Sequence, residues 1–210
     1  MIRFPLTVSL VVFFFTTFSG CSVLGIRSGY EQLDYTVVDT MDGAEVRQYP
    51  PRVVAQVDGM KDDNESFRVL FRYISGENSS DANVAMTTPV QVDKASTEIA
   101  MTTPVEISKA TNESVTMRFF LPRSFTPESA PKPTDSRIRI LGLPAETYAA
   151  VTYSGARSEE RFRLESERLK DILASSRWKA VSTPSFLGYD PPFAIPFLRR
   201  NEAIVKVESR

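Results

Sequence analysis

The residue types that most often carry out catalysis or bind metals are scarce in this chain. It has no histidine and one cysteine among its 210 residues. Without histidine there is no Ser-His-Asp or Cys-His catalytic set, no histidine-bound zinc and no histidine-ligated heme. The sequence also lacks a glycine-rich phosphate loop and a cysteine pair. We therefore expect a binding protein rather than an enzyme, and no metal is directly indicated.

One dense polar cluster, Arg199-Arg200-Asn201-Glu202, precedes a predicted strand. It is open to two interpretations. Its arginines could bind a carboxylate of a ligand. Alternatively, the arginines and Glu202 could satisfy buried backbone groups and each other, which is the commoner use of such residues.

The cysteine follows a segment with the features of an export signal. Arg3 supplies a positive charge, and Leu6 to Phe18 is uncharged and mostly apolar. That run is short for a membrane span but has the length of a signal-peptide core. It ends at Phe18-Ser19-Gly20-Cys21, and small residues before a cysteine are typical of a bacterial lipoprotein cleavage site.

We predict a signal peptide over residues 1–20 and a lipidated tether over residues 21–29, with acyl chains on Cys21. The alternative is ordinary signal cleavage that leaves Cys21 unmodified. Because Ser22 and not aspartate follows the cysteine, nothing indicates retention in the inner membrane. The expected location is the bacterial cell envelope, anchored by lipid to the outer membrane and facing the periplasm.

Residues 30–210 are predicted to form one domain. The chain is 42% hydrophobic and 24% charged, as in an ordinary globular protein. Its net charge of −1 provides no basic surface for nucleic acid, so nucleic acid is not an expected partner.

Hydrophobic periodicity predicts three strands and a helix in the first half. The strands cover 35–38, 44–48 and 52–58, and the third has one face better buried than the other. The helix begins after Asp62 as its N-cap and ends at Gly76. Its predicted buried stripe, spaced i, i+3, i+4 and i+7, consists of Phe67, Leu70, Phe71 and Ile74.

The second half repeats this order. Its predicted elements are strands at 115–121, 137–141 and 147–153, a helix from Ser158 to about Ser175, and strands near 183–189 and 203–208. The pair Asp58-Gly59 before the first helix corresponds to Ser154-Gly155 before the second. This repetition predicts an internal duplication with pseudo-two-fold symmetry, in an α+β fold with a mostly antiparallel sheet.

Several short motifs are unusual. The hexapeptide AMTTPV occurs at Ala85–Val90 and again at Ala100–Val105. The others are AEVRQYP at 44–50, FFLP at 119–122 and GYDPP at 188–192. Together these motifs resemble the SOUL (heme-binding protein) family, and the resemblance runs from about Tyr30 to Val207.

The resemblance implies a distorted eight-stranded barrel that carries two helices and binds a tetrapyrrole. In such members the ligand lies in an apolar groove beside the first helix, near the proline loop. A heme is a flat apolar disc with two carboxylates, so it needs apolar walls and a cation at the rim. The candidate groove residues here are Phe67, Arg68, Leu70, Phe71, Arg72, Tyr189, Pro191 and Pro192.

Two basic positions depart from the family pattern. Arg72 matches a basic position on the family's first helix, but Asn64 stands where a second basic residue is found. In the proline loop, Ala194 or Ile195 replaces a lysine, depending on gap placement.

Iron ligation has few candidates without histidine. The residues that remain are Met86, Met101 and a tyrosine such as Tyr73 or Tyr189, and the iron could also have no protein ligand. A methionine in a strand is more often part of the core than a ligand.

Two functions follow from the resemblance. The first is a lipid-anchored envelope protein that binds heme or another tetrapyrrole without histidine ligation. The second is an envelope interaction module that keeps the same fold and has lost the ligand.

Overall fold

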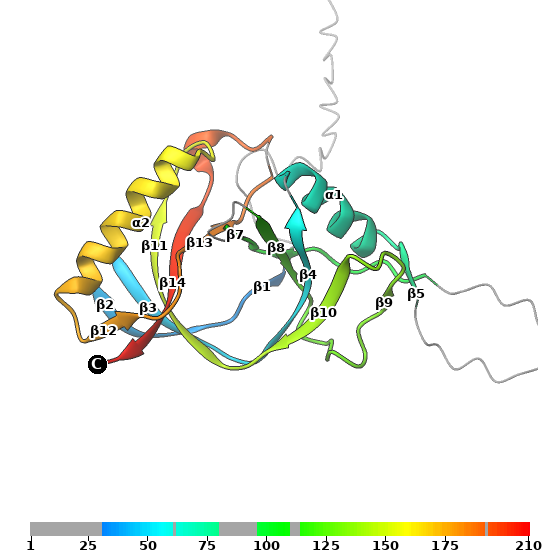
Figure 1. Ribbon diagram of the computed structural model, residues 1–210, viewed down its shortest axis with the longest axis horizontal. Coiled ribbons are helices and arrows are strands. Elements are labelled where there is room, and N and C mark those ends of the chain that lie inside the picture. Colours follow the sequence, from blue (N-terminus) through cyan, green and yellow to red (C-terminus); the bar gives the residue numbers. More distant parts are fainter. Residues whose placement is uncertain (1–30, 61, 80–95, 110–113, 192) are drawn as a thin grey trace, which may run out of the picture.

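The computed structural model describes residues 31–60, 62–79, 96–109, 114–191 and 193–210. Cys21 and its tether, the first AMTTPV copy with Met86, and Pro192 lie outside the described residues. Within them, two α-helices lie on a large curved sheet (Figure 1), and the predicted α+β class is confirmed.

The main sheet has ten strands, and every pairing in it is antiparallel. Its path is β10 (Ile138–Leu143), β4 (Arg52–Met60), β8 (Val115–Phe120), β7 (Val105–Lys109), β13 (Ser185–Gly188), β14 (Asn201–Ser209), β11 (Glu146–Tyr153), β3 (Ala44–Tyr49) and β2 (Thr36–Met41). A further strand, β12 (Trp178–Ala180), pairs with β14. Two short ladders join β1 (Glu31–Gln32) to β6 (Thr102–Thr103) and β5 (Asn78–Ser79) to β9 (Lys132–Pro133).

The strand order has the predicted pseudo-two-fold symmetry. The sequence β10-β4-β8-β7 is mirrored by β3-β11-β14-β13, and the two halves meet where β7 pairs with β13. These eight strands agree in number with the eight-stranded form that the family resemblance implies, and β2 and β12 extend the sheet. The chain passes from β3 into β4 through Pro50-Pro51 and from β10 into β11 through Pro144-Ala145. The continuous runs β3–β4 and β10–β11 together form a long two-stranded ribbon. This ribbon crosses between the halves and curls the sheet (Figure 1).

A tight turn at Asp42-Gly43 joins β2 to β3. Both residues have positive φ, 40° and 82°, as a tight hairpin turn requires. The third predicted strand became β4, but its burial differs from the prediction because Val53 to Val57 are all buried. A helix covers one face of β4, and the curled sheet encloses the other.

Each helix begins at a side-chain cap. Asp62 accepts a hydrogen bond from the Asn64 amide at the start of α1 (Asp63–Ile74), and Gly76 follows its end with φ of 107°. Ser158 caps α2 (Glu159–Ala174) in the same way. The 3₁₀ turn η1 (Pro196–Leu198) precedes β14. No helix in the described ranges is long and apolar enough to cross a bilayer.

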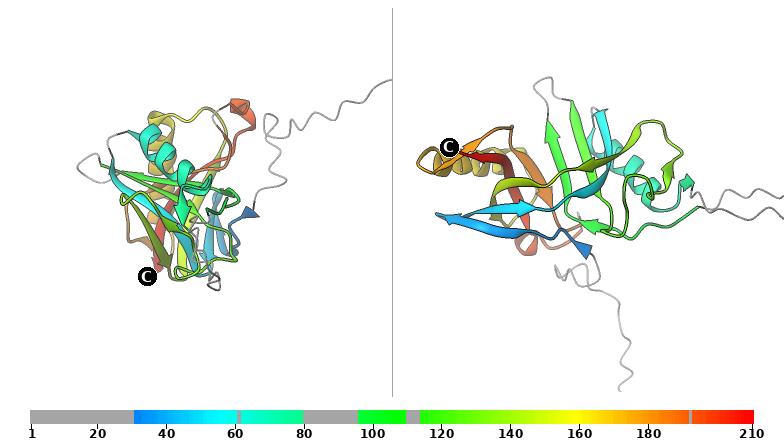
Figure 2. Two further views of the ribbon diagram at one scale, coloured as in Figure 1. Left: turned by 90° about the vertical axis from the view of Figure 1, so that its right-hand side faces the viewer. Right: turned by 90° about the horizontal axis from the view of Figure 1, so that it is seen from below.

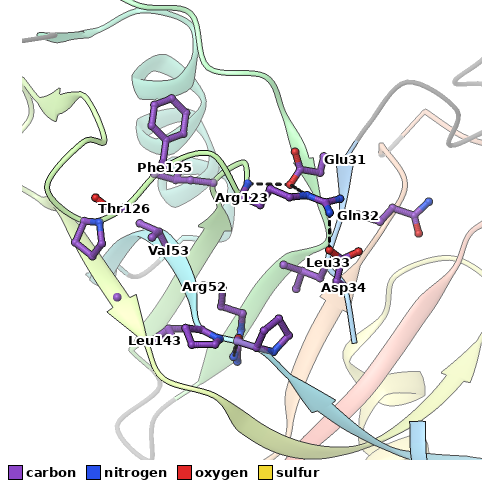
Figure 3. Close-up of a pocket in the computed structure, with 15 residues that line it drawn as sticks. Glu31, Gln32, Leu33, Asp34, Arg52, Val53, Arg123, Phe125, Thr126 and Leu143 are labelled. Atoms are coloured by element: carbon purple, nitrogen blue, oxygen red, sulfur yellow. Dashed lines mark hydrogen bonds and ion pairs between the residues drawn. The ribbon is translucent and has the colours of Figure 1, made fainter. Parts of the chain in front are cut away.

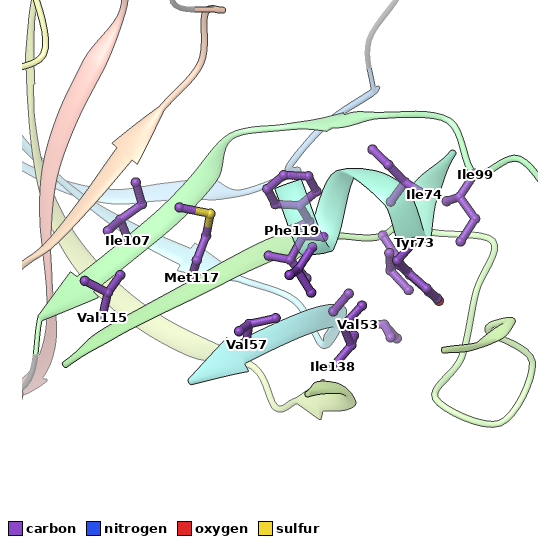
Figure 4. Close-up of a cluster of buried hydrophobic side chains, with 14 of the residues drawn as sticks. Val53, Val57, Tyr73, Ile74, Ile99, Ile107, Val115, Met117, Phe119 and Ile138 are labelled. Carbon is purple, nitrogen blue, oxygen red and sulfur yellow. The ribbon is translucent and has the colours of Figure 1, made fainter. Parts of the chain in front are cut away.

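The helices cover different halves of the sheet. Helix α1 packs on β4 and β8, whereas α2 packs on β11, β12 and β14, and the two diverge from the middle of the molecule (Figures 1 and 2). The largest buried cluster lies beneath α1, where Val57, Tyr73, Phe119 and Ile138 come together (Figure 4). A second cluster around Leu169 lies beneath α2. Both helices are therefore fixed to the sheet by apolar packing.

Candidate functional site

Helix α1 presents a different face to the core from the one predicted. Its buried residues are Ser66, Val69, Leu70, Tyr73 and Ile74. Leu70 is fully buried and Ile74 is buried, as predicted, but Phe71 is 44% exposed and Phe67 is only partly buried. The stripe is shifted because Tyr73 occupies the core, where its hydroxyl donates to the Pro131 carbonyl over 2.8 Å.

The two phenylalanines form a stacked pair at the helix surface. The rings of Phe67 and Phe71 are 5.8 Å apart and inclined by 14°. Phe67 in turn meets Phe119 of β8 edge-to-face at 5.3 Å. The inner ring is thus held by the core, while the outer ring is open to a partner. A flat apolar ligand could stack on such a surface.

Two arginines flank this pair. Arg72 is 49% exposed, and its guanidinium lies 3.5 Å from Glu77 and 3.8 Å from Asp135. Asp135 also receives hydrogen bonds from Arg137, which together with Arg72 lower the pKa of its carboxyl to about 2. Arg68 is exposed and has no ion-pair partner among the described residues. Of the two, Arg68 is the cation free to meet an anionic group.

A cavity of about 630 Å³ opens beside the start of α1. Asp63 and Asn64 line it on one side, and the first turn of α2 lines the other. Its apolar floor consists of Ile107, Phe162 and Phe186, and the two phenylalanines meet edge-to-face at 6.1 Å. The volume lies within the range of small-molecule sites.

The aromatic pair continues one wall of this cavity. Asn64, Phe67 and Phe71 are spaced i, i+3 and i+7, so they share one face of α1. Phe67 and Phe162 also pack against the same core cluster. Asn64, which lines the cavity, and the exposed Phe71 ring therefore lie on the same face of α1.

The rim of the cavity carries charged residues that form ion pairs with one another. Arg157 pairs with Asp63, and Lys109 pairs with Glu159. A hydrogen bond and the positive charge of Lys109 lower the pKa of the exposed Glu159 carboxyl. An anionic ligand entering here would have to displace a carboxylate from one of these cations, which disfavours the rim relative to Arg68.

Tyr189 does not contribute its side chain to the face of α1. It is buried in the other half, where its hydroxyl donates to Glu202 over 2.8 Å and its ring lies 4.2 Å from the Arg200 guanidinium. Pro191 is partly buried in the following loop. The structure thus brings together Phe67, Phe71 and Arg68 of the predicted groove, with Arg72 nearby and Leu70 beneath them.

The polar cluster at the start of β14 has a structural role. Glu202 is fully buried and accepts hydrogen bonds from Arg47, Arg200 and Thr152. Asn201 donates to the Gly155 carbonyl over 3.0 Å. Of the two interpretations offered by the sequence, mutual satisfaction of buried groups describes this geometry.

The tyrosines considered for iron are engaged elsewhere. The hydroxyls of Tyr73 and Tyr189 both donate to protein oxygens. Burial raises the pKa of each phenol, which opposes the phenolate form that would bind iron. Met101 packs against the main core cluster. In the described part of the chain, no group of three acidic or cysteine residues could hold a metal ion.

The sequence did not reveal the cavity residues on the second helix and on β7 and β13. Ile107, Phe162 and Phe186 belong to none of the sequence motifs described above. The internal duplication was the one sequence feature that could have indicated where these cavity residues lie. Because Asp58-Gly59 and Ser154-Gly155 precede equivalent helices, both helices start near the symmetry centre, where β7 meets β13.

Comparison with known proteins agrees with the fold. Residues 30–206 match the family described as SOUL heme-binding protein. Heme-binding protein 1 of Xenopus laevis and that of Xenopus tropicalis are each 27% identical over 133 residues, or 63% of this chain. The match spans 64% of the length of those relatives, slightly less than two thirds.

Solved structures with this fold are distant in sequence. The EcmrR C-terminal domain is 15% identical with a TM-score of 0.52, over 84% of this chain and 99% of its own. A hydrolase from Listeria innocua is 13% identical with a TM-score of 0.54, over 81% of this chain and 94% of its own. At these identities the likeness shows the fold alone.

Proposed function

Because the chain belongs to the SOUL heme-binding protein family, we propose that it binds a planar tetrapyrrole beside α1. The ligand lies on the aromatic pair Phe67 and Phe71 and extends toward the cavity at Asn64. The observation that carries this proposal is the exposed Phe71 ring, stacked on a second ring that is anchored in the core.

The residues present fit the organic part of a heme. The paired rings offer an apolar plane for the macrocycle, and Arg68 offers a guanidinium for one propionate. A bound heme would supply redox-active iron. The chain's own residues provide stacking and charge, since the two tyrosines considered as ligands donate their hydroxyls elsewhere.

Truncation of the outer ring tests this site. We expect Phe71→Ala to weaken hemin binding about tenfold, because an aromatic contact contributes roughly 1 kcal/mol beyond the area it buries. Soret absorbance and quenching of Trp178 fluorescence during a hemin titration measure the affinity.

Val38→Ala is the control. Val38 is 40% exposed and lies on β2, the edge strand of the other half, so its loss removes an exposed apolar side chain away from α1. It should leave hemin affinity unchanged. Equal weakening by both variants would contradict the assignment of the site to α1.

The second candidate is an interaction module that has lost the ligand. The paired rim cations, Arg157 with Asp63 and Lys109 with Glu159, favour it because they are not available to an anionic ligand. It predicts no saturable spectral change with hemin, together with a stable protein partner that co-purifies with the chain.

We also propose that the domain is held in the bacterial envelope by acyl chains on Cys21. The support is the sequence pattern Phe18-Ser19-Gly20-Cys21 after an apolar run. In the same proposal, the lipid anchor is in the outer membrane and the domain faces the periplasm.

A further inference from the structure

The loop between β13 and β14 carries the two most exposed large apolar side chains of the described residues. Phe193 is 65% exposed and Phe197 is 72% exposed, and Leu198 is 38% exposed. They belong to the run Pro191 to Leu198, in which every residue is apolar. Several exposed apolar side chains on one loop are typical of a surface that contacts an apolar partner.

Hydrogen bonds hold the backbone of this loop in place. The Nε–H of Arg199 donates to the Ala194 carbonyl over 2.8 Å, and Ala194 itself is buried. The Gly155 amide donates to the Pro196 carbonyl over 3.0 Å, which ties η1 to the segment before α2. The backbone is therefore held before and after Phe197, so the fold itself presents this ring to the outside.

The loop lies at one end of the molecule. In Figure 1 it is the orange-red segment above the sheet, at the end where α2 begins. The first turns of α1 and α2, which line the cavity of about 630 Å³, lie at the same end. A partner that covers the loop therefore also faces the starts of both helices.

The N-terminal part of the described chain is fixed beside the base of this loop. Arg123 binds Glu31 at 3.2 Å and Asp34 at 2.8 Å (Figure 3). The hydroxyl of the next residue, Tyr35, accepts a hydrogen bond from the Arg200 guanidinium over 3.5 Å, and Arg200 comes two residues after η1. Because four residues span at most about 14 Å, Glu31 lies within that distance of Tyr35.

The proposed lipid anchor provides an apolar partner near this point. Ten residue steps lead from Cys21 to Glu31, and they reach about 35 Å at full extension. Acyl chains on Cys21 would hold the loop close to a bilayer at a high effective concentration, so that even a weak contact is populated. The choice of a membrane as the partner rests on that proposed anchor.

The chemistry of the loop suits the surface of a bilayer. Phenylalanine and leucine are side chains that enter the boundary between headgroups and acyl chains. The run has no charge that would lose its hydration there. Its three prolines have no N–H, and the Ala194 and Leu198 amides donate to carbonyls within the loop, so few donors are left for water to satisfy.

We propose that Phe193, Phe197 and Leu198 form a membrane-contact surface, which enters the headgroup region of the bilayer that holds the Cys21 anchor. The anchor confines the domain to the membrane, and the loop fixes its orientation. In this orientation the starts of α1 and α2 face the bilayer.

A tryptophan at position 197 tests the contact locally. Phe197→Trp keeps an aromatic ring, and Trp178 on β12, away from the loop in Figure 1, gives a reference emission. The full chain is coupled through the Cys21 thiol to a maleimide lipid in vesicles of phosphatidylethanolamine and phosphatidylglycerol. Brominated acyl chains quench a tryptophan that reaches them. We expect them to remove most of the emission that the substitution adds, and to leave the Trp178 emission of the natural protein almost unchanged.

Val38→Trp is the matched control, because Val38 is 40% exposed on the edge strand β2. The emission that this substitution adds should persist. Adding Phe193→Ala to Phe197→Trp should reduce the quenching, since one of the contacting rings is lost.

The proposal is overturned if the tryptophans added at positions 197 and 38 are quenched equally, or if neither is quenched. It is also overturned if the emission from position 197 shifts with protein concentration in the absence of vesicles, which would assign the loop to a second copy of this chain. Because the maleimide lipid replaces natural acylation, these results stand whether or not cells acylate Cys21. Failure of the loop contact would likewise leave the Cys21 anchor and the tetrapyrrole site to their own tests.

Discussion

Glu202 shows how a buried charge is accommodated in this fold. Its carboxylate is fully buried and is bound by Arg47 at 2.8 Å and by Arg200 at 2.6 Å. Burial opposes its ionisation, but the hydrogen bonds and charges of the two arginines outweigh burial. The pKa of the carboxyl is therefore held below its usual value of 4.5.

Removing this charge should be costly. Glu202→Gln leaves Arg47 buried without a full counter-charge, and we expect the free energy of unfolding at neutral pH to fall by about 3 kcal/mol or more. Urea unfolding measures the loss. Glu167→Gln, which affects an exposed pair with Arg163, should change it by less than about 1 kcal/mol.

The same carboxyl predicts a pH dependence. Its folded pKa lies below the value of 4.5 that an unfolded chain would show, so its stabilising contribution is present above pH 4.5. As the pH falls below 4.5, the unfolded state takes up the proton first and the contribution is lost. Urea midpoints should therefore fall more steeply below pH 4.5 for the natural protein than for Glu202→Gln. Parallel curves would contradict this.

At the scale of elements, one side chain, Asp62, caps the start of α1. Asp62 accepts the Asn64 amide over 2.8 Å, and it also carries a negative charge at the positive end of the helix. We expect Asp62→Ala to lower the free energy of unfolding by about 1 kcal/mol. Asp62→Asn, which keeps an acceptor oxygen, should recover most of that loss in the same measurement.

Most elements could be predicted from local sequence. Turn residues and apolar runs located β2, β3 and β4, although β4 is buried continuously from Val53 to Val57 and does not alternate. Asp62 and Gly76 marked the ends of α1 because capping is a local interaction. The strand β12 was not predicted, because its three residues pair only with β14 and are too few to show a periodic pattern.

The face of α1 could not be predicted in the same way. Two stripes, one with Phe67 and Phe71 and one with Val69 and Tyr73, share Leu70 and satisfy the helical period almost equally well. The choice depends on the Pro131 carbonyl, which lies 58 residues away in sequence and accepts the Tyr73 hydroxyl. A long-range hydrogen bond decides which aromatic rings remain exposed for a ligand.

At the scale of the whole molecule, the internal duplication determines where the cavity between the helix starts lies. Because each half contributes one helix after a long strand, the starts of α1 and α2 lie on either side of the β7–β13 junction. The cavity at Asn64 and Phe162 is a product of this symmetry rather than of any single motif. The motif GYDPP, by contrast, serves the buried network around Glu202 through Tyr189.

The proposed lipid anchor on Cys21 determines where the whole molecule is held. We expect Cys21→Ser to move the protein from the membrane fraction to the soluble envelope fraction, because it removes the thiol that would carry acyl chains. Mass spectrometry of the natural protein should show Cys21 as a lipid-modified N-terminus. A free thiol at Cys21 in the membrane fraction would contradict the anchor.

Stacking of a tetrapyrrole on the exposed face of α1 is the proposal on which the assigned function depends. Amide chemical-shift mapping with iron-free protoporphyrin IX tests it most directly, because the probe keeps the flat ring and the propionates without paramagnetic broadening. We expect saturable shifts concentrated between Asn64 and Arg72, with smaller changes near Phe162. Shifts confined to other parts of the chain, or none that saturate, would contradict it.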